Sequence, residues 1–143
     1  MMHNQQGVLR IITKLMLPMI LLFALYVQFH GDYGPGGGFQ AGVIFASGII
    51  LYAMVFGLDA ARRVVPVRLL TVLMPFGVLL YAGVGVASLF MGGEFLNYSS
   101  LSPHHPVHGQ HYGILLVELG VGISVAAVMM SIFLAFAGRG RQK

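Results

Sequence analysis

The chain alternates four long apolar stretches with shorter polar ones. The apolar stretches cover residues 11–29, 39–58, 69–91 and 112–137. A helix that crosses a bilayer needs about 20 mostly apolar residues, whereas the strands of a membrane barrel alternate apolar and polar positions. Runs such as "GVIFASGIILYAMVFG" do not alternate. The pattern therefore predicts an all-α integral membrane protein whose four transmembrane helices form one domain over residues 1–143.

Composition favours the same class of protein. Hydrophobic residues make up 57% of the chain and charged residues 8%, and the mean hydropathy is +0.85. A soluble domain carries about 25% charged residues, so this chain has too little polar surface to face water on all sides. The absence of cysteine excludes a disulfide framework and a thiolate metal site. We expect neither a cofactor nor a resident metal.

The basic residues predict the orientation of the helices. The eight Lys and Arg residues all fall on one side of a four-span arrangement, at Arg10, Lys14, Arg62, Arg63, Arg68, Arg139, Arg141 and Lys143. The two opposite loops, residues 30–38 and 92–111, contain none. By the positive-inside rule both termini are cytoplasmic. The net charge of +4 is therefore a topology signal and does not indicate nucleic-acid binding. Asp59 is expected to pair with Arg62 or Arg63 at the interface.

Glu118 is the acid that lies inside an otherwise apolar span, in "YGILLVELGVGISVAAVMM". An ionised carboxylate at that depth is costly unless it is paired, neutralised or facing a wet cavity. Ion or proton handling is one interpretation. A protonated carboxyl that hydrogen-bonds a neighbouring helix is a second, and an interfacial position at a later span start is a third.

The glycine-rich stretch "HGDYGPGGGFQAG" joins the first two spans. A phosphate-binding loop would need a Lys and a Ser or Thr after the glycines, and neither is present there. The stretch is interpreted either as a tight outer turn or as non-helical backbone held at membrane depth by neighbouring protein. In the second case the run would be part of a surface shared with neighbouring protein, formed by Gly34, Pro35, Gly36, Gly37, Gly38, Phe39 and Gly42.

Further glycines and histidines add candidate contacts and candidate chemistry. Small residues four apart, such as Gly42 with Ala46 and Gly83 with Ala87, predict close helix packing, as does Gly120 with Ser124. His30 and Asp32 stand at the outer mouth of the first span and are candidates for an ion pathway. The second outer loop carries His104, His105, His108 and His111. We interpret this loop as exposed and solvated, with proton or metal binding as the alternative.

"GPGGGFQAGVIFASGIIL", followed by "LLVELGVGISVAA" in the last span, closely resembles the MrpB/MnhB family, one of the component chains of the Mrp (also Mnh) multi-subunit cation/proton antiporters. The resemblance covers roughly residues 7–138. Its most specific parts are the run from Pro35 to Phe39 with Gly42, and Glu118 followed by Leu119 and Gly120.

The resemblance implies a non-autonomous subunit of a bacterial inner-membrane assembly that exchanges sodium for protons. Its partners would be the other antiporter subunits and the bilayer, and its cargo would be sodium ions and protons. The resemblance also implies that the glycine-rich segment up to Gly42 shapes a subunit contact or the ion route. It further implies that Glu118, accompanied by Gly120, is the polar element of the last helix. Few other ionisable groups lie in the spans, so most of any ion path must come from other chains.

Two other functions compete with this interpretation. A self-sufficient four-helix homo-oligomer, of the small multidrug resistance sort, would be similar in length but would carry its essential glutamate in the first span, which here has no acid. A purely structural subunit would use the glycine-rich faces for packing alone. An enzyme is not expected, because the sequence contains no nucleophile–base pair or cofactor motif.

Overall fold

The computed structural model describes residues 2–31, 36–98 and 106–139, with side chains from residue 7 onward and, in the last helix, from residue 109 onward. Its elements are α1 (Met2–His30), α2 (Gly38–Phe56), α3 (Leu58–Val64), α4 (Val67–Phe90) and α5 (Pro106–Arg139). The described residues contain no strand. Four helices are long and apolar enough to cross a membrane. The prediction of an all-helical protein with four long apolar helices is therefore confirmed.

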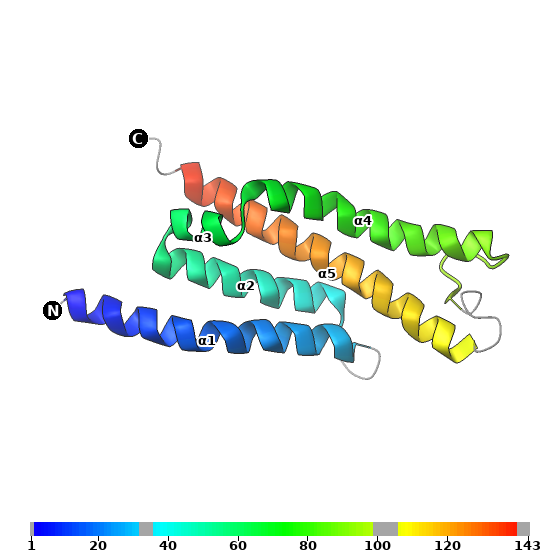
Figure 1. Cartoon of the computed structure of the whole chain (residues 1–143), viewed down its shortest axis with the longest axis horizontal. Helices are drawn as coiled ribbons and strands as arrows, with labels where there is room; N and C mark the ends of the chain where they lie inside the picture. Colours follow the sequence, from blue (N-terminus) through cyan, green and yellow to red (C-terminus); the bar gives the residue numbers. More distant parts are fainter. Residues whose placement is uncertain (1, 32–35, 99–105, 140–143) are drawn as a thin grey trace.

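The four long helices lie side by side in a row, in the order α1, α2, α5, α4 (Figure 1). α1 and α4 run in one direction, and α2 and α5 run in the other (Figure 1). The two central helices, α2 and α5, are therefore parallel neighbours. The start of α1 and the end of α5 lie at the same end of the row (Figure 1). Which end faces the cytoplasm remains a prediction.

The short helix α3 was not expected. Gly57 separates it from α2 and adopts φ 95°, a conformation that glycine tolerates and other residues rarely adopt. For this reason α2 ends at Phe56, before the predicted limit of 58. α3 has Asp59 in its first turn and Arg62 and Arg63 in its last, which complements the helix dipole at both ends. The pairing of Asp59 with these arginines stays a prediction.

The buried core lies where α2, α4 and α5 meet. It consists of Ala46, Leu70, Ala126, Ala127, Met130 and Leu134. Outside it, large apolar side chains such as Leu79, Phe90 and Phe136 are exposed, and only 11% of the most apolar window of α1 is buried. A row of helices with both faces apolar needs lipid or other chains to cover it.

Small residues set how closely the helices approach, although not at every expected pair. Gly42 and Ala46 are buried at the contact between α2 and α5. Gly83 makes no such contact within this chain, because it is exposed and a Cβ built there meets nothing within 4 Å. The close contacts of α4 occur instead at Gly77 and Gly85, which point toward α5 and toward Phe95.

Candidate functional site: a carboxylate enclosed by glycines

Glu118 lies on α5 and is half-buried, with its carboxylate directed at the connection between α1 and α2. A Cβ built at Gly31 would touch both carboxylate oxygens and would lie 2.9 Å from Oε1. A Cβ built at Gly37 would also lie 2.9 Å from Oε1. Real Cβ atoms do not approach other atoms so closely. The carboxylate therefore occupies space that is available only because positions 31 and 37 are glycine.

The backbones of α2 and α5 touch at this same point. A Cβ built at Gly38 would overlap the carbonyl oxygen of Glu118 and would lie 3.0 Å from its Cα. One turn further along, a Cβ at Gly42 would lie 2.7 Å from the carbonyl oxygen of Gly122 and 3.0 Å from the Cβ of Val125. Gly38 and Gly42 therefore allow the two helices to cross in backbone contact, which is the use of small residues four apart in membrane helices.

Gly37 has a conformational role as well as a spatial one. It precedes α2 as its N-cap residue with φ 138° and ψ −177°, a region that is essentially restricted to glycine. Its carbonyl accepts the backbone N–H of Ala41 at 3.0 Å, which starts the helix. Gly37 therefore turns the chain into α2, and Gly38 packs against α5. The tight outer turn and the backbone held at membrane depth both stay predictions, because Gly34 and Pro35 lie outside the described residues.

The electrostatic setting of the carboxylate follows from where α2 begins. The first N–H groups of a helix lack partners within the helix, and its N-terminus carries a partial positive charge. α2 has no acidic side chain in its own first turn and no side-chain cap. Glu118 reaches that end from α5, so its carboxyl group lies at the positive end of a neighbouring helix. A carboxyl group at such a position can be protonated, or it can be ionised and bind a cation.

Gln28 on α1 is a polar residue of this region that the sequence analysis missed. Its side chain is 5% exposed and packs on Gly122, one helical turn beyond Glu118; a Cβ at Gly122 would lie 2.6 Å from the Gln28 Oε1. The available signal was a lone amide inside the first apolar span, where a polar group must find a partner.

The opposite face of α5 meets α4 through a second set of small residues. Because residues two apart on a helix differ by about 200°, Gly120 and Gly122 point in nearly opposite directions. A Cβ at Gly120 would lie 2.7 Å from the Gly77 carbonyl oxygen. The hydroxyl of Ser124 donates to the carbonyl of Met74 at 3.1 Å, next to Pro75 in α4. The structure thus places Gly120, a predicted contact residue, between α5 and α4 of this chain.

The other predicted residues are distributed unevenly around the carboxylate. His30 is exposed and stacks on Tyr26 with ring centroids 5.0 Å apart, directly before Gly31. Phe39 is 63% exposed, so it does not enclose the carboxylate. A Cβ at Gly36 would lie 3.3 Å from the Cγ1 of Val27 on α1. The predictions for Asp32, Gly34 and Pro35 lie outside the described residues.

Most of the His-rich loop also lies outside what the structure describes. This applies to His104, His105 and the side chain of His108. Within the described part of the chain, no three His, Asp or Glu side chains gather closely enough to hold a metal ion.

Four apolar helices with a carboxylate enclosed by glycines define a multi-pass membrane protein with one candidate ion-handling group. Comparison with known proteins then identifies its family. Residues 8–131 match the family model described as a domain related to the MnhB subunit of Na+/H+ antiporter, and the chain belongs to this MnhB family. The resemblance found in the sequence is confirmed.

Two relatives illustrate the similarity. The "Putative antiporter subunit mnhB2" of Staphylococcus haemolyticus (strain JCSC1435) is 34% identical over 139 residues, which cover 96% of this chain and 98% of the relative. The protein of the same name in Staphylococcus aureus (strain Newman) shows the same identity and coverage. Membership of an antiporter-subunit family indicates a transport protein, and the similarity extends over nearly the whole length of both chains.

Proposed function

We propose that this chain is a non-autonomous membrane subunit of a multi-subunit Na+/H+ antiporter, in which it helps to assemble the complex and holds Glu118 at the edge of an ion pathway. The family match over residues 8–131 supports the first part. The enclosure of the Glu118 carboxylate by Gly31 and Gly37 supports the second. The partners are the other antiporter subunits, within a bacterial inner membrane, and both termini are cytoplasmic.

The enclosure of Glu118 is the observation that carries the ion-handling role. Gly37 is also favoured by its own backbone conformation, whereas Gly31 is not among the positive-φ glycines, and the atoms nearest a Cβ built there all belong to the Glu118 carboxylate. Gly31 and Gly37 leave room for the carboxyl group of Glu118. Gly37 also stands at the start of α2, so the positive end of that helix dipole faces the same carboxyl group. A carboxylate in this setting can bind and release a proton or a sodium ion as the neighbouring subunits change its access to water.

The subunit role also follows from what the row of helices lacks. The other acids in the described part of the chain, Asp59 and Glu94, are exposed and lie outside the four spans. A route across a membrane needs several such groups, so the remaining ones come from other chains. The homo-oligomeric transporter is not favoured, because the chain belongs to a family of antiporter subunits.

The first experiment purifies the tagged chain from native membranes in mild detergent and identifies the proteins that accompany it by mass spectrometry. We expect several other hydrophobic subunits in one large particle. Recovery of the chain alone, or only with copies of itself, would contradict the subunit role and support the homo-oligomer.

The second experiment measures Na+-driven proton movement in everted vesicles that contain the complete complex with Glu118→Gln. Glutamine keeps the size and hydrogen-bonding capacity of the side chain but cannot ionise. We expect antiport to fall at least tenfold while the complex still assembles. The matched control is Glu94→Gln, the same substitution at an exposed acid outside the four spans, and it should leave antiport unchanged. Full antiport by an assembled Glu118→Gln complex would show that Glu118 does not handle ions.

A further inference from the structure

The end of α1 contacts α5 at two successive levels beside the glycine enclosure of Glu118. Gly31, which directly follows α1, meets the Glu118 carboxyl group. Gln28, in the last turn of α1, meets Gly122, since its Oε1 would lie 2.6 Å from a Cβ built there. Glu118 and Gly122 are four positions apart and share one face of α5. The Gln28 amide therefore lies one helical turn further along the α5 span than Glu118, on the same face.

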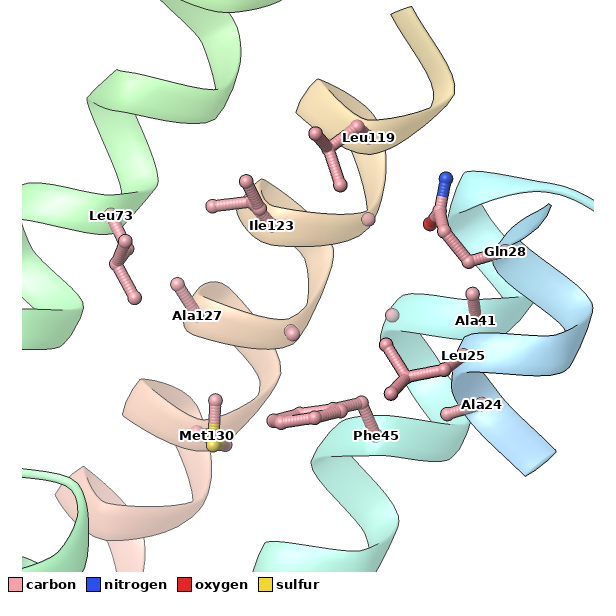
Figure 2. Close-up of a pocket in the computed structure, with 13 residues that line it drawn as sticks. Ala24, Leu25, Gln28, Ala41, Phe45, Leu73, Leu119, Ile123, Ala127 and Met130 are labelled. Carbon is pink, nitrogen blue, oxygen red and sulfur yellow. The ribbon is translucent and has the colours of Figure 1, made fainter. Parts of the chain in front are cut away.

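The Gln28 amide is buried with an unused donor. The residue is 5% exposed, and its enclosed Nε2 has no hydrogen-bond partner in the described part of the chain. Gln28 lies at one end of an apolar groove, and its nitrogen points away from Phe45 and Met130 of that groove (Figure 2). A buried donor without a partner is unfavourable. Because the nitrogen is enclosed, its acceptor has to come from this chain.

Glu118 carries a side-chain acceptor one turn away from this donor. Side chains four positions apart on a helix have Cβ atoms about 5–6 Å apart. The carboxyl group stands at the end of a flexible side chain whose bonds occupy alternative staggered rotamers. A change of rotamer moves the carboxyl group along α5, from an outer position against Gly31 and Gly37 to an inner position beside Gly122 and Gln28.

The chemistry of an amide matches only one form of this carboxyl group. A protonated carboxyl group has one donor and one acceptor, as the end of a glutamine side chain does. In the inner position the Gln28 Nε2 donates to the carbonyl oxygen of the acid, and the acid O–H donates to the Gln28 Oε1. An ionised carboxylate only accepts, so it is repelled by Oε1 and is better placed at the N-terminus of α2.

We propose that Gln28 is a positioning residue that holds the protonated Glu118 carboxyl group in the inner position, whereas the ionised group lies in the outer position. Uptake of a proton then moves the carboxyl group by one helical turn, about 5 Å, and release of the proton returns it. The inner position contributes to transport only if Glu118 handles ions, so it rests on the proposed function.

The other ionisable groups around Glu118 do not compete for the Gln28 amide. α2 contains no charged residue. On α1, His30 is exposed and stacks on Tyr26, and on α5, His111 lies seven positions before Glu118. Tyr81 of α4 lies on the opposite face of α5, where its backbone nitrogen packs near Gly120. Within the described part of the chain, none of these groups is a carboxyl group.

The test records infrared difference spectra of the complete complex in nanodiscs, between alkaline and acidic pH. The carbonyl band of protonated Glu118 is the band that Glu118→Gln removes. Hydrogen bonding lowers the frequency of such a band. Gln28→Met keeps the length of the side chain but forms neither hydrogen bond, so it should shift the band to higher frequency and lower antiport at least threefold. Thr13→Val, at another buried polar position of α1, should change neither.

The outcomes separate this inference from the proposed function. An unshifted band in an assembled Gln28→Met complex would overturn the inner position, and the ion-handling role of Glu118 would stand as long as Glu118→Gln abolishes antiport. Full antiport by an assembled Glu118→Gln complex would overturn that role and the inference with it.

A second measurement needs no variant and decides the matter if Gln28→Met fails to assemble. Density maps of the unmodified complex at acidic and alkaline pH should show the Glu118 carboxyl group in two places. We expect it beside the Gln28 amide at acidic pH and against Gly31 and Gly37 at alkaline pH. The same position in both maps would overturn the proposal.

Discussion

The carboxylate of Glu118 on α5 lies against Gly37, the residue that begins α2, although the two are 81 positions apart in the sequence. This contact joins the two sequence features that stood out separately, the acid in the last span and the glycine run. The absence of a Cβ at Gly31 and Gly37 leaves space that the glutamate side chain occupies. The proposed site is therefore the junction of two parallel helices and the residue that leads into one of them.

Gly38→Ala should weaken the packing of α2 against α5. The new Cβ would overlap the backbone carbonyl of Glu118, which cannot move without shifting the whole helix. Overpacking of this kind destabilises by about 1–3 kcal/mol. We expect a lower thermal midpoint of the purified complex, or failure to assemble it, measured by size-exclusion chromatography after heating.

The matched control for that prediction is Gly83→Ala on α4. A Cβ at Gly83 meets nothing within 4 Å, and alanine favours a helix over glycine by up to about 1 kcal/mol. The control should therefore be neutral or slightly stabilising. Equal effects of the two substitutions would contradict the close approach of α2 to α5.

Gly31→Ala should displace the Glu118 carboxylate without disturbing the helix backbones. At this position the new Cβ would meet only the far end of a flexible side chain. We expect the complex to assemble normally and to lose most of its antiport activity in everted vesicles. Gly7→Ala, where a Cβ meets nothing within 4 Å, should retain full activity. Normal antiport in Gly31→Ala would show that the position of the carboxylate does not matter.

Ser124→Ala should loosen the contact between α5 and α4. It removes the hydrogen bond from the Ser124 hydroxyl to the Met74 carbonyl. Hydrogen bonds between membrane helices contribute about 0.6 kcal/mol on average, so the fall in thermal midpoint should be small. Gly77→Ala, whose Cβ would overlap the Ser124 hydroxyl and the Gly120 carbonyl, should cause a clearly larger fall. The reverse order would contradict the described geometry of this contact.

The predicted topology can be tested with single cysteines, because the chain has none of its own. Glu94 and Val64 are both exposed and lie beyond opposite ends of α4. If both termini are cytoplasmic, Glu94→Cys should react with a membrane-impermeant thiol reagent in intact cells. Val64→Cys should react only after the membrane is permeabilised. The opposite pattern would reverse the orientation.

Tyr98 should make the segment that follows α4 sensitive to alkaline pH. Burial raises the pKa of Tyr98 above its ordinary value of 10.0, and the nearby Tyr81 raises it further. The folded protein thus holds the phenol proton more tightly than the unfolded chain does. The contribution of this group to stability is therefore complete below pH 10 and declines as the pH rises above it. Thermal midpoints should fall less above pH 10 in Tyr98→Phe than in the unmodified protein. Tyr112 is exposed, so the thermal midpoint of Tyr112→Phe should fall as much as that of the unmodified protein.

The sequence alone determined the class of the protein and the number of its long helices. Hydrophobic runs of this length leave few alternatives, because backbone polar groups in a bilayer must be satisfied within a helix or a closed barrel. The position of Glu118 inside an apolar run marked it as a candidate for the same energetic reason. The glycine run was recognised as unusual, but whether it turned, packed or bound an ion remained open.

The tertiary structure decided which glycines matter and what they contact. The spacing of Gly83 and Ala87 looked as suitable for packing as that of Gly42 and Ala46, yet within this chain a Cβ at Gly83 meets nothing within 4 Å, whereas Gly42 packs on α5. Spacing places residues on one face of a helix but does not say what that face meets. The enclosure of Glu118 and the buried amide of Gln28 depend on α1, α2 and α5 lying together. Such contacts join residues far apart in the chain, so a local sequence pattern cannot reveal them.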